Sequence, residues 1–224
     1  MMPTRPMRAW AGALALTALV AACATPSPTP RPDCPAAAPT AADASSILAD
    51  ADQAVVRTNK GEFTIQLHGE AAPIATANFV ALARCGFYDG ISFHRVIADF
   101  VIQAGDPETK TNRGDFEGLG AGGPGYRFGI ETPADGLNYD RYAVAMANAG
   151  GTDTNGSQFF IDLADLDARL PRSYTIFGLV IAGTDAVDAI GQVPTNGPRG
   201  VPLDPVIIDT MAVQAEPDAS PTPG

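Results

Sequence analysis

The chain has 224 residues, 46% hydrophobic and 17% charged, which is enough for one domain of ordinary size or two small ones. Its 23 glycines and 20 prolines disfavour a helical bundle and favour a loop-rich fold with a disordered part. The net charge of −11 argues against binding of nucleic acid, whose phosphates an acidic chain repels, and two histidines with three cysteines argue against a zinc site.

Residues 1–22 are typical of a signal peptide. Arg5 and Arg8 precede an apolar run at 9–22, which is too short to span a bilayer comfortably. The small residues before Cys23 resemble the bacterial lipobox, which implies cleavage before Cys23 and a lipid on its sulfur. We therefore expect an exported protein anchored to a bacterial cell membrane on its extracytoplasmic side. An ordinary signal peptide, with Cys23 incidental, is the alternative.

Residues 23–52 are rich in proline and alanine and predict a lipid-anchored tether. Proline fixes φ and removes backbone donors, so this stretch is expected to form neither helix nor sheet, beyond a weak helical turn at 45–51. The tail at 214–224 has the same character and predicts disorder. A disulfide between Cys34 and Cys85 is possible in an oxidising compartment, but two unpaired thiols are the default expectation.

Residues 53–213 remain for one folded domain, and its elements are predicted in chain order. Strands are expected wherever β-branched and aromatic residues cluster between turn signals, and helices where apolar residues recur at helical spacing. The strands lie at 54–58, 62–67, 91–97, 100–104, 141–146, 158–163, 174–181 and 206–213, and the helices at 73–85 and 184–190. This order predicts a mainly β fold, a closed antiparallel eight-stranded β-barrel capped by two short helices.

Two sequence blocks carry the functional signal. The first is FHRVIADFVIQAGD at 93–106, and the second joins MANAG at 146–150 to TNGSQFFI at 154–161. Together they closely resemble the cyclophilin family of peptidyl-prolyl cis-trans isomerases, over about residues 54–213. The resemblance implies a cyclophilin-like barrel that binds proline-containing segments of unfolded or exported proteins and assists their folding.

The residues suit that chemistry independently of the resemblance. Side chains at i and i+2 of a strand share a face, so Val101 lies beside Gln103 and Gln158 beside Phe160. Each strand then presents an apolar group and an amide to a proline-containing peptide. Rotation about a peptide bond faces a barrier of ~18–20 kcal/mol but breaks no bond. No nucleophile, metal or cofactor is therefore expected.

The resemblance implies a role for each site residue. Arg95 would donate to the prolyl nitrogen, and Gln103 would hold the substrate carbonyl and orient Arg95. The substrate-binding residues would be Phe100, Val101, Ala147, Asn148, Gln158, Phe160, Leu170 and Tyr174. The sequence departs from the family pattern at Val101, where many members have methionine, and around Arg169, where the best-known members have tryptophan.

Other interpretations stay open at this point. Arg95 could form a surface salt bridge, and each apolar residue could belong to the core. A non-catalytic peptide-binding chaperone on the same scaffold is the alternative function. A serine hydrolase would need a nucleophile elbow, which the chain lacks. A monomer is the default expectation.

Overall fold

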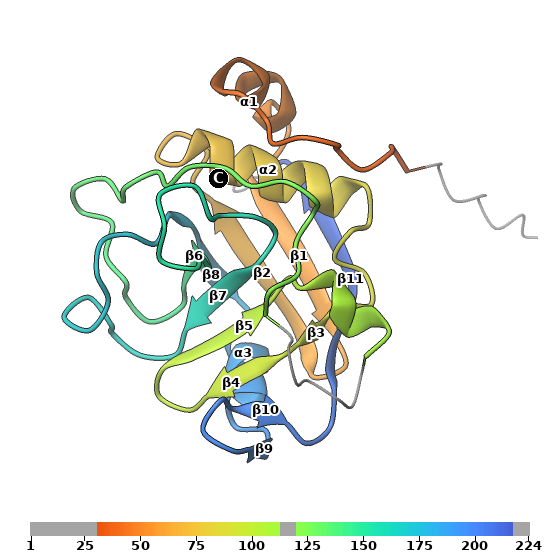
Figure 1. Ribbon diagram of the computed structural model, residues 1–224, viewed down its shortest axis with the longest axis vertical. Coiled ribbons are helices and arrows are strands. Elements are labelled where there is room, and N and C mark those ends of the chain that lie inside the picture. The colour runs from red at the N-terminus through yellow and green to blue at the C-terminus, as the bar shows by residue number, and fades with distance from the viewer. Residues whose placement is uncertain (1–30, 113–119, 217–224) are drawn as a thin grey trace, which may run out of the picture. The chain divides into compact units, whose positions relative to one another are not determined.

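The computed structural model describes residues 31–112 and 120–216, so the predicted signal peptide and Cys23 lie outside the described residues. Its order of elements is close to the predicted one (Figure 1). The helices are α1 (Ala41–Leu48), α2 (Pro73–Arg84), α3 (Thr184–Gly191) and the 3₁₀ turn η1 (Pro107–Lys110). The strands are β1 (Gln53–Thr58), β2 (Gly61–Leu67), β3 (Ser92–Phe93), β4 (Arg95–Ile97), β5 (Val101–Ala104), β6 (Ala143–Met146), β7 (Phe159–Asp162), β8 (Ile176–Ala182), β9 (Thr195–Asn196), β10 (Val201–Pro202) and β11 (Val206–Gln214).

Nine strands form the main sheet, in the order β3-β11-β1-β2-β8-β6-β7-β5-β4. All its pairs are antiparallel, and the sheet curls until β3 and β4, consecutive in sequence, form its two edges. The backbone N–H of His94, between them, donates to the carbonyl of Gln103 at 3.1 Å and helps to close the ring. The predicted antiparallel barrel is therefore confirmed.

The count of eight strands is wrong by one, because the predicted strand at 91–97 is divided at His94. Before His94 the chain pairs with β11, and after it the chain pairs with β5. The N–H of Val96 donates instead to Gly200, at 2.7 Å. A strand that changes partner at the barrel closure cannot continue as one ladder.

One apolar core fills the barrel and extends beneath two helices. The Phe79 ring of α2 packs against Tyr88, Phe159 and Phe177, with centroid distances of 4.9–5.6 Å. Val187 and Ile190 of α3 are fully buried in the same core. In Figure 1, α2 crosses the upper end of the barrel and α3 lies in its lower part, as expected for the two predicted helices.

The third helix, α1, corrects the prediction for 23–52, because it begins four residues before the weak helical turn expected at 45–51 and forms a regular helix. Thr40 begins the helix with a capping box: its N–H donates to the Asp43 carboxylate at 2.9 Å, and its hydroxyl accepts from the Asp43 N–H at 3.3 Å. The last proline of the segment, Pro39, lies before the cap, so no proline prevents the alanine-rich run that follows from forming a helix. Arg84 of α2 fixes its end by donating to the carbonyl of Ile47 at 2.7 Å.

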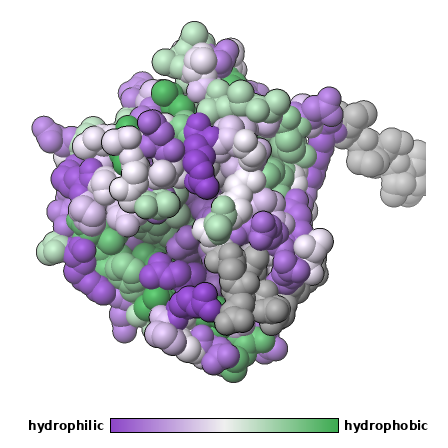
Figure 2. Space-filling model, in the orientation of Figure 1, coloured by the Kyte–Doolittle hydropathy of each residue, from purple (hydrophilic) through white to green (hydrophobic). Residues whose placement is uncertain are grey.

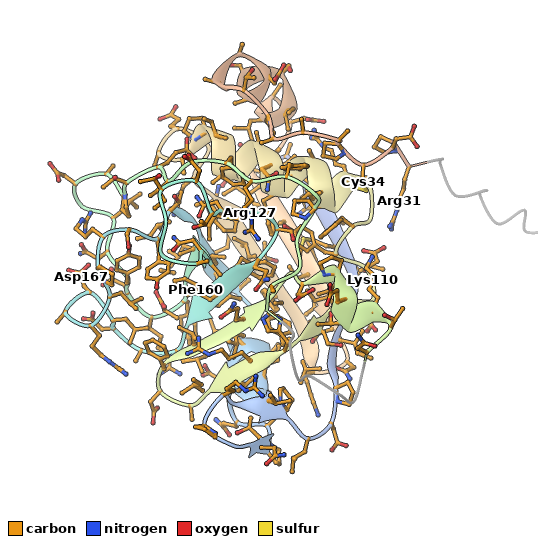
Figure 3. All side chains as sticks on the ribbon, in the orientation of Figure 1. Arg31, Cys34, Lys110, Arg127, Phe160 and Asp167 are labelled. Atoms are coloured by element: carbon orange, nitrogen blue, oxygen red, sulfur yellow. A yellow bond between two sulfur atoms is a disulfide. The ribbon has the colours of Figure 1, made fainter. Side chains whose placement is uncertain are left out.

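A disulfide joins Cys34 to Cys85 at the end of α2, with their Cα atoms 5.1 Å apart, so the default expectation of two unpaired thiols is wrong. Arg31, just before it, forms an ion pair with Asp89 (Figure 3). Residues 31–50 are thereby held along α2 as an N-terminal strap. None of the described helices is long and apolar enough to cross a membrane.

One carboxyl group is buried without a hydrogen bond. Asp162 ends β7 opposite Val101, is fully buried, and neither of its side-chain oxygens has a hydrogen-bond partner among the described residues. Burial, and to a smaller extent the nearby charge of Asp140, raises the pKa of Asp162 to about 8. The group is therefore protonated at neutral pH.

Breaking the disulfide should destabilise the domain. The bond closes a separation of 51 residues, and such crosslinks typically contribute about 2–4 kcal/mol by restricting the unfolded chain. We expect Cys34→Ser to lower the free energy of unfolding by that amount in a denaturant titration. Dithiothreitol should lower the parent to the variant's value and leave the variant unchanged. Equal stability of parent and variant would show that the disulfide does not attach the N-terminal strap to the end of α2.

Asp162 should make stability fall as pH rises. Its pKa in the folded protein lies above the ordinary value of 3.8, so the folded state binds the proton more tightly than the unfolded state between about pH 4 and pH 8. We expect the stability of Asp162→Asn relative to the parent to rise by several kcal/mol between pH 4 and pH 8, because each unit by which the folded pKa exceeds the ordinary value corresponds to about 1.4 kcal/mol. Thermal melts at both pH values measure this, and a pH-independent difference would argue against a raised pKa.

Candidate active site

The strand register gathers the predicted catalytic residues on one face. Arg95 of β4 pairs with Gln103 of β5, Gln103 pairs with Phe160 of β7, and Phe160 pairs with Ala145 of β6. Directly paired residues of antiparallel strands project to the same side of a sheet. Their sequence neighbours Ile102 and Phe159 point into the barrel core, so this row lies on the outer face.

An apolar cluster covers part of that face, separate from the barrel core. Val101 and Phe160 are almost completely buried in it, and the rings of Phe160 and Tyr174 meet edge to face at 5.4 Å. It contains six of the eight predicted substrate-binding residues: Val101 and Phe160, with Phe100, Ala147, Leu170 and Tyr174 packed at its edge. Figure 2 shows an apolar area below and left of centre with hydrophilic groups along its edge, and Figure 3 labels Phe160 in the same region.

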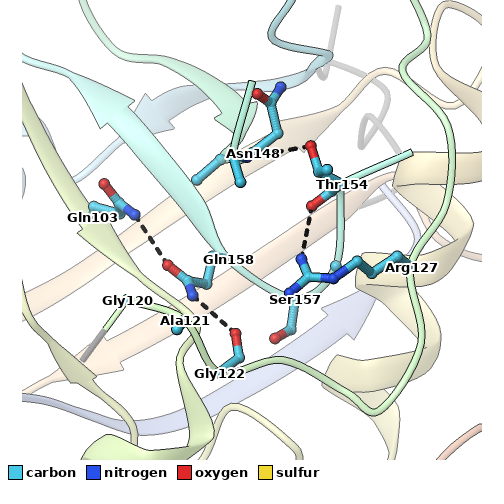
Figure 4. Close-up of a pocket in the computed structure, with 12 residues that line it drawn as sticks. Gln103, Gly120, Ala121, Gly122, Arg127, Asn148, Thr154, Ser157 and Gln158 are labelled. Atoms are coloured by element: carbon cyan, nitrogen blue, oxygen red, sulfur yellow. Dashed lines mark hydrogen bonds between the residues drawn. The ribbon is translucent and has the colours of Figure 1, made fainter. Parts of the chain in front are cut away.

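A chain of amides holds the guanidinium beside this cluster. Arg95 Nη1 donates to Gln103 Oε1 at 3.3 Å, and Gln103 Nε2 donates to Gln158 Oε1 at 3.0 Å. Gln158 Nε2 donates in turn to the carbonyl of Gly122 at 2.8 Å (Figure 4). The predicted orientation of Arg95 by Gln103 agrees with this geometry, and Arg95 keeps further N–H groups free of any hydrogen bond within the described residues.

Two guanidinium groups lie close to the Phe100 ring. The Cζ atom of Arg95 lies 5.5 Å from the ring centroid, and that of Arg169 lies 4.8 Å from it. Arg169 also donates to the carbonyl of Asp99 at 3.1 Å. Partial burial lowers the pKa of Arg95, and Tyr174 opposes this shift. Sequence reasoning gave Arg169 no role, because it marked this position only as one that lacks tryptophan.

A hollow of about 220 Å³ adjoins the amide chain (Figure 4). The predicted binding residues Gln158, Ala147 and Asn148 line it, with Gly120–Gly122 opposite. The Asn148 side chain is engaged within the protein, because Nδ2 donates to Ser173 at 2.8 Å and Oδ1 accepts from Gly150 at 3.0 Å. A ligand would therefore meet chiefly the backbone of Asn148, in keeping with its predicted role.

Arg127 also lines this hollow and was not singled out by the sequence. Its Nη1 donates to the carbonyl of Thr154 at 3.1 Å. Arg127 lies outside both motif blocks, so no local pattern predicts that it lines the hollow. Its position depends on the path that the folded chain takes from Gly122 to Thr154.

His94 is the titratable side chain next to Arg95 in the sequence, and its ring lies inside the protein. His94 is buried, its ring nitrogens have no hydrogen-bond partner among the described residues, and burial lowers its pKa to about 4. The His94 backbone helps to close the barrel, whereas its ring makes no hydrogen bond among the described residues. The described residues contain no cluster of His, Cys, Asp and Glu able to hold a metal ion.

Comparison with known proteins agrees with this geometry. Residues 54–213 match the family model described as cyclophilin type peptidyl-prolyl cis-trans isomerase/CLD. The peptidyl-prolyl cis-trans isomerase A of Mycobacterium tuberculosis is 42% identical over 178 residues, covering 71% of this chain and 91% of the relative. The peptidyl-prolyl cis-trans isomerase B of Streptomyces anulatus is 40% identical over 185 residues, covering 75% of this chain and 99% of the relative.

A solved structure shares the fold. The crystal structure of a cyclophilin type peptidyl-prolyl cis-trans isomerase from Cryptosporidium parvum superposes with a TM-score of 0.65 at 33% identity, covering 75% of this chain and 99% of that one. The family match spans the barrel and both motif blocks, where Arg95, Gln103 and Phe160 lie. The chain therefore belongs to the cyclophilin-type peptidyl-prolyl cis-trans isomerases.

Proposed function

We propose that this isomerase acts on X–Pro bonds of exported proteins at a membrane surface and accelerates rotation through Arg95. The observation that carries the proposal is the row of Arg95, Gln103 and Phe160, which sets a fixed guanidinium beside an apolar surface. That surface suits a proline ring, and the amides of Gln103 and Gln158 suit the flanking peptide groups.

The reaction requires differential binding of a twisted amide. Resonance holds the peptide bond planar, and a catalyst lowers the rotation barrier by binding the twisted state more tightly than either planar isomer. Twisting localises a lone pair on the prolyl nitrogen. A free N–H of Arg95 can donate to that nitrogen, which opposes the return of C–N double-bond character and stabilises the transition state.

Preorganisation gives Arg95 this ability. Donors that are already aligned when charge develops need no reorganisation during the reaction. Gln103 holds one guanidinium nitrogen at 3.3 Å, and the Phe100 ring lies against its Cζ atom at 5.5 Å. Both contacts limit the rotamers of a long side chain that would otherwise move freely.

The apolar cluster supplies the binding energy. Burial of apolar surface contributes about 25 cal/mol per Å². Proline has an apolar ring and no backbone N–H, so its ring can be buried without leaving a hydrogen-bond donor unpaired. Tyr174 and Phe100 are the partly buried aromatic rings at the edge of this cluster, and Phe160 packs beneath them with its ring against Tyr174. Packing of the proline ring leaves the bond before it free to rotate above Gln103.

Several features support a site outside the cytoplasm. The signal-like residues 1–22 and the lipobox-like Cys23 favour export and anchoring. The Cys34–Cys85 disulfide suits an oxidising compartment. A monomeric domain on such an anchor would meet proline-containing segments of proteins that fold after export.

Loss of the guanidinium should strongly reduce turnover while binding persists. We expect Arg95→Ala to lower kcat/KM for an Ala-Pro peptide by ~10²–10³-fold, the scale of losing one preorganised donor. The Kd of the peptide should change less than about threefold, because the apolar cluster is intact. Arg57→Ala, which removes an exposed arginine of β1, serves as the control and should keep full activity. Unchanged turnover of Arg95→Ala would instead favour a binding chaperone or another catalytic group.

Cys23 should determine membrane attachment. We expect Cys23→Ser, expressed in a bacterium, to shift the protein from the membrane pellet to the soluble fraction without changing kcat/KM. One lipid chain holds a protein only marginally, so complete retention in the parent would require a lipid with two or more chains. Membrane retention of the variant would contradict a lipid anchor at this residue.

A further inference from the structure

A buried carboxylate outside the predicted site organises one wall of the hollow. Asp106 follows β5 and is fully buried. Its carboxylate accepts three backbone N–H groups: Glu108 at 2.9 Å on Oδ1, and Gly120 at 2.7 Å and Gly122 at 3.2 Å on Oδ2. Hydrogen bonds to an ionised acceptor are roughly twice as strong as those between neutral groups. Asp106 therefore holds the glycine-rich segment 120–122 against the end of β5.

This segment leads directly to the catalytic row. The carbonyl of Gly122 accepts from Gln158 Nε2 at 2.8 Å, and Gln158 Oε1 accepts from Gln103 Nε2 at 3.0 Å. Gln103 Oε1 then accepts from Arg95 at 3.3 Å. Figure 4 shows the middle links of this path, with Gln103, Gln158 and Gly122 in sequence. Each amide uses both ends of its side chain, so the orientation of one residue fixes that of the next.

Gly122 lies so close to the Asp106 carboxylate that no side chain fits between them. A Cβ atom at Gly122 would lie 2.1 Å from Asp106 Oδ1, far inside van der Waals contact. Glycine is thus required for the close approach that the hydrogen bond to Oδ2 needs. A side chain here would push the loop and the carboxylate apart without removing the charge.

We propose that Asp106 is a positioning residue for Arg95, acting through Gly122, Gln158 and Gln103. The carboxylate fixes the Gly122 carbonyl, this carbonyl fixes the Gln158 amide, and the two glutamines fix the guanidinium. Asp106 does not contact the substrate or change the chemistry. Its role rests on the proposed catalytic role of Arg95.

Neutralising the carboxylate tests the path. Asp106→Asn keeps the shape but removes the charge, and its single amide oxygen cannot accept from both Glu108 and the two glycines, so the segment 120–122 is held less firmly. We expect kcat for an Ala-Pro peptide, measured by NMR exchange spectroscopy, to fall by about tenfold, equal to ~1.4 kcal/mol of transition-state stabilisation. KM should change less than about threefold, because the apolar cluster is untouched.

A matched control separates positioning from general stability. Glu131 likewise accepts two backbone N–H groups, from Ile74 at 2.9 Å and Ala75 at 2.8 Å, at the start of α2. Glu131→Gln should lower thermal stability and leave kcat unchanged. Gly122→Ala should reproduce the loss of kcat with the carboxylate present, and it serves as the test if Asp106→Asn does not fold.

A double-mutant cycle assigns the effect to Arg95. If Asp106 acts through Arg95, Asp106→Asn should cost less than about twofold in kcat in the Arg95→Ala background. A full tenfold loss of kcat in the Arg95→Ala background would show that Asp106 does not act through Arg95. Unchanged kcat in folded Asp106→Asn and Gly122→Ala would also overturn the proposal. If Arg95→Ala alone kept full activity, the proposed catalytic role of Arg95 would fail first, which distinguishes the two failures.

Discussion

The register between β4, β5 and β7 is the constraint on which the site depends. It sets Arg95, Gln103 and Phe160 opposite one another on the outer face, while their neighbours Ile102 and Phe159 fill the barrel core. Because side chains alternate along a strand, a slip of one residue would bury the guanidinium and expose the core. The apolar packing that stabilises the barrel therefore also fixes the geometry that we propose for catalysis.

Closure of the barrel adds to this constraint. The chain changes partner at His94, so Arg95 begins β4 one residue after the point where the ring closes. The backbone of His94 is thus tied to Gln103, the same residue whose side chain holds Arg95. Two independent links between adjacent segments leave the guanidinium little freedom to move relative to the amide chain.

Local sequence signals predicted most of the barrel. The β-rich runs, the helix that begins at Pro73 and the two motif blocks each carry their information within a few residues. Part of the apolar cluster could be predicted because it lies in those blocks, as for Val101 and Phe160, whereas its members Tyr139, Leu166 and Ile176 lie outside them and were not predicted. Their contact in one cluster, as for Phe160 and Tyr174, is a property of the folded chain.

Apart from the local capping box at Thr40, the features that the sequence analysis missed depend on contacts distant in sequence. Composition around Pro39 suggested an unstructured tether, whereas the capping box at Thr40 and the support of Arg84 favour a helix. The Cys34–Cys85 disulfide requires a strap that lies along α2, which no local pattern encodes. Arg127 and Arg169 reach the site from segments without a motif.

The most direct test of the account measures rotation within the bound peptide. NMR exchange spectroscopy on a saturated Ala-Pro peptide yields the rate of cis-trans interconversion on the protein, separately from binding and release. The account predicts that this on-protein rate collapses by two orders of magnitude or more in Arg95→Ala, while the peptide still binds. Equal on-protein rates in the parent and in Arg95→Ala would contradict catalysis by the guanidinium.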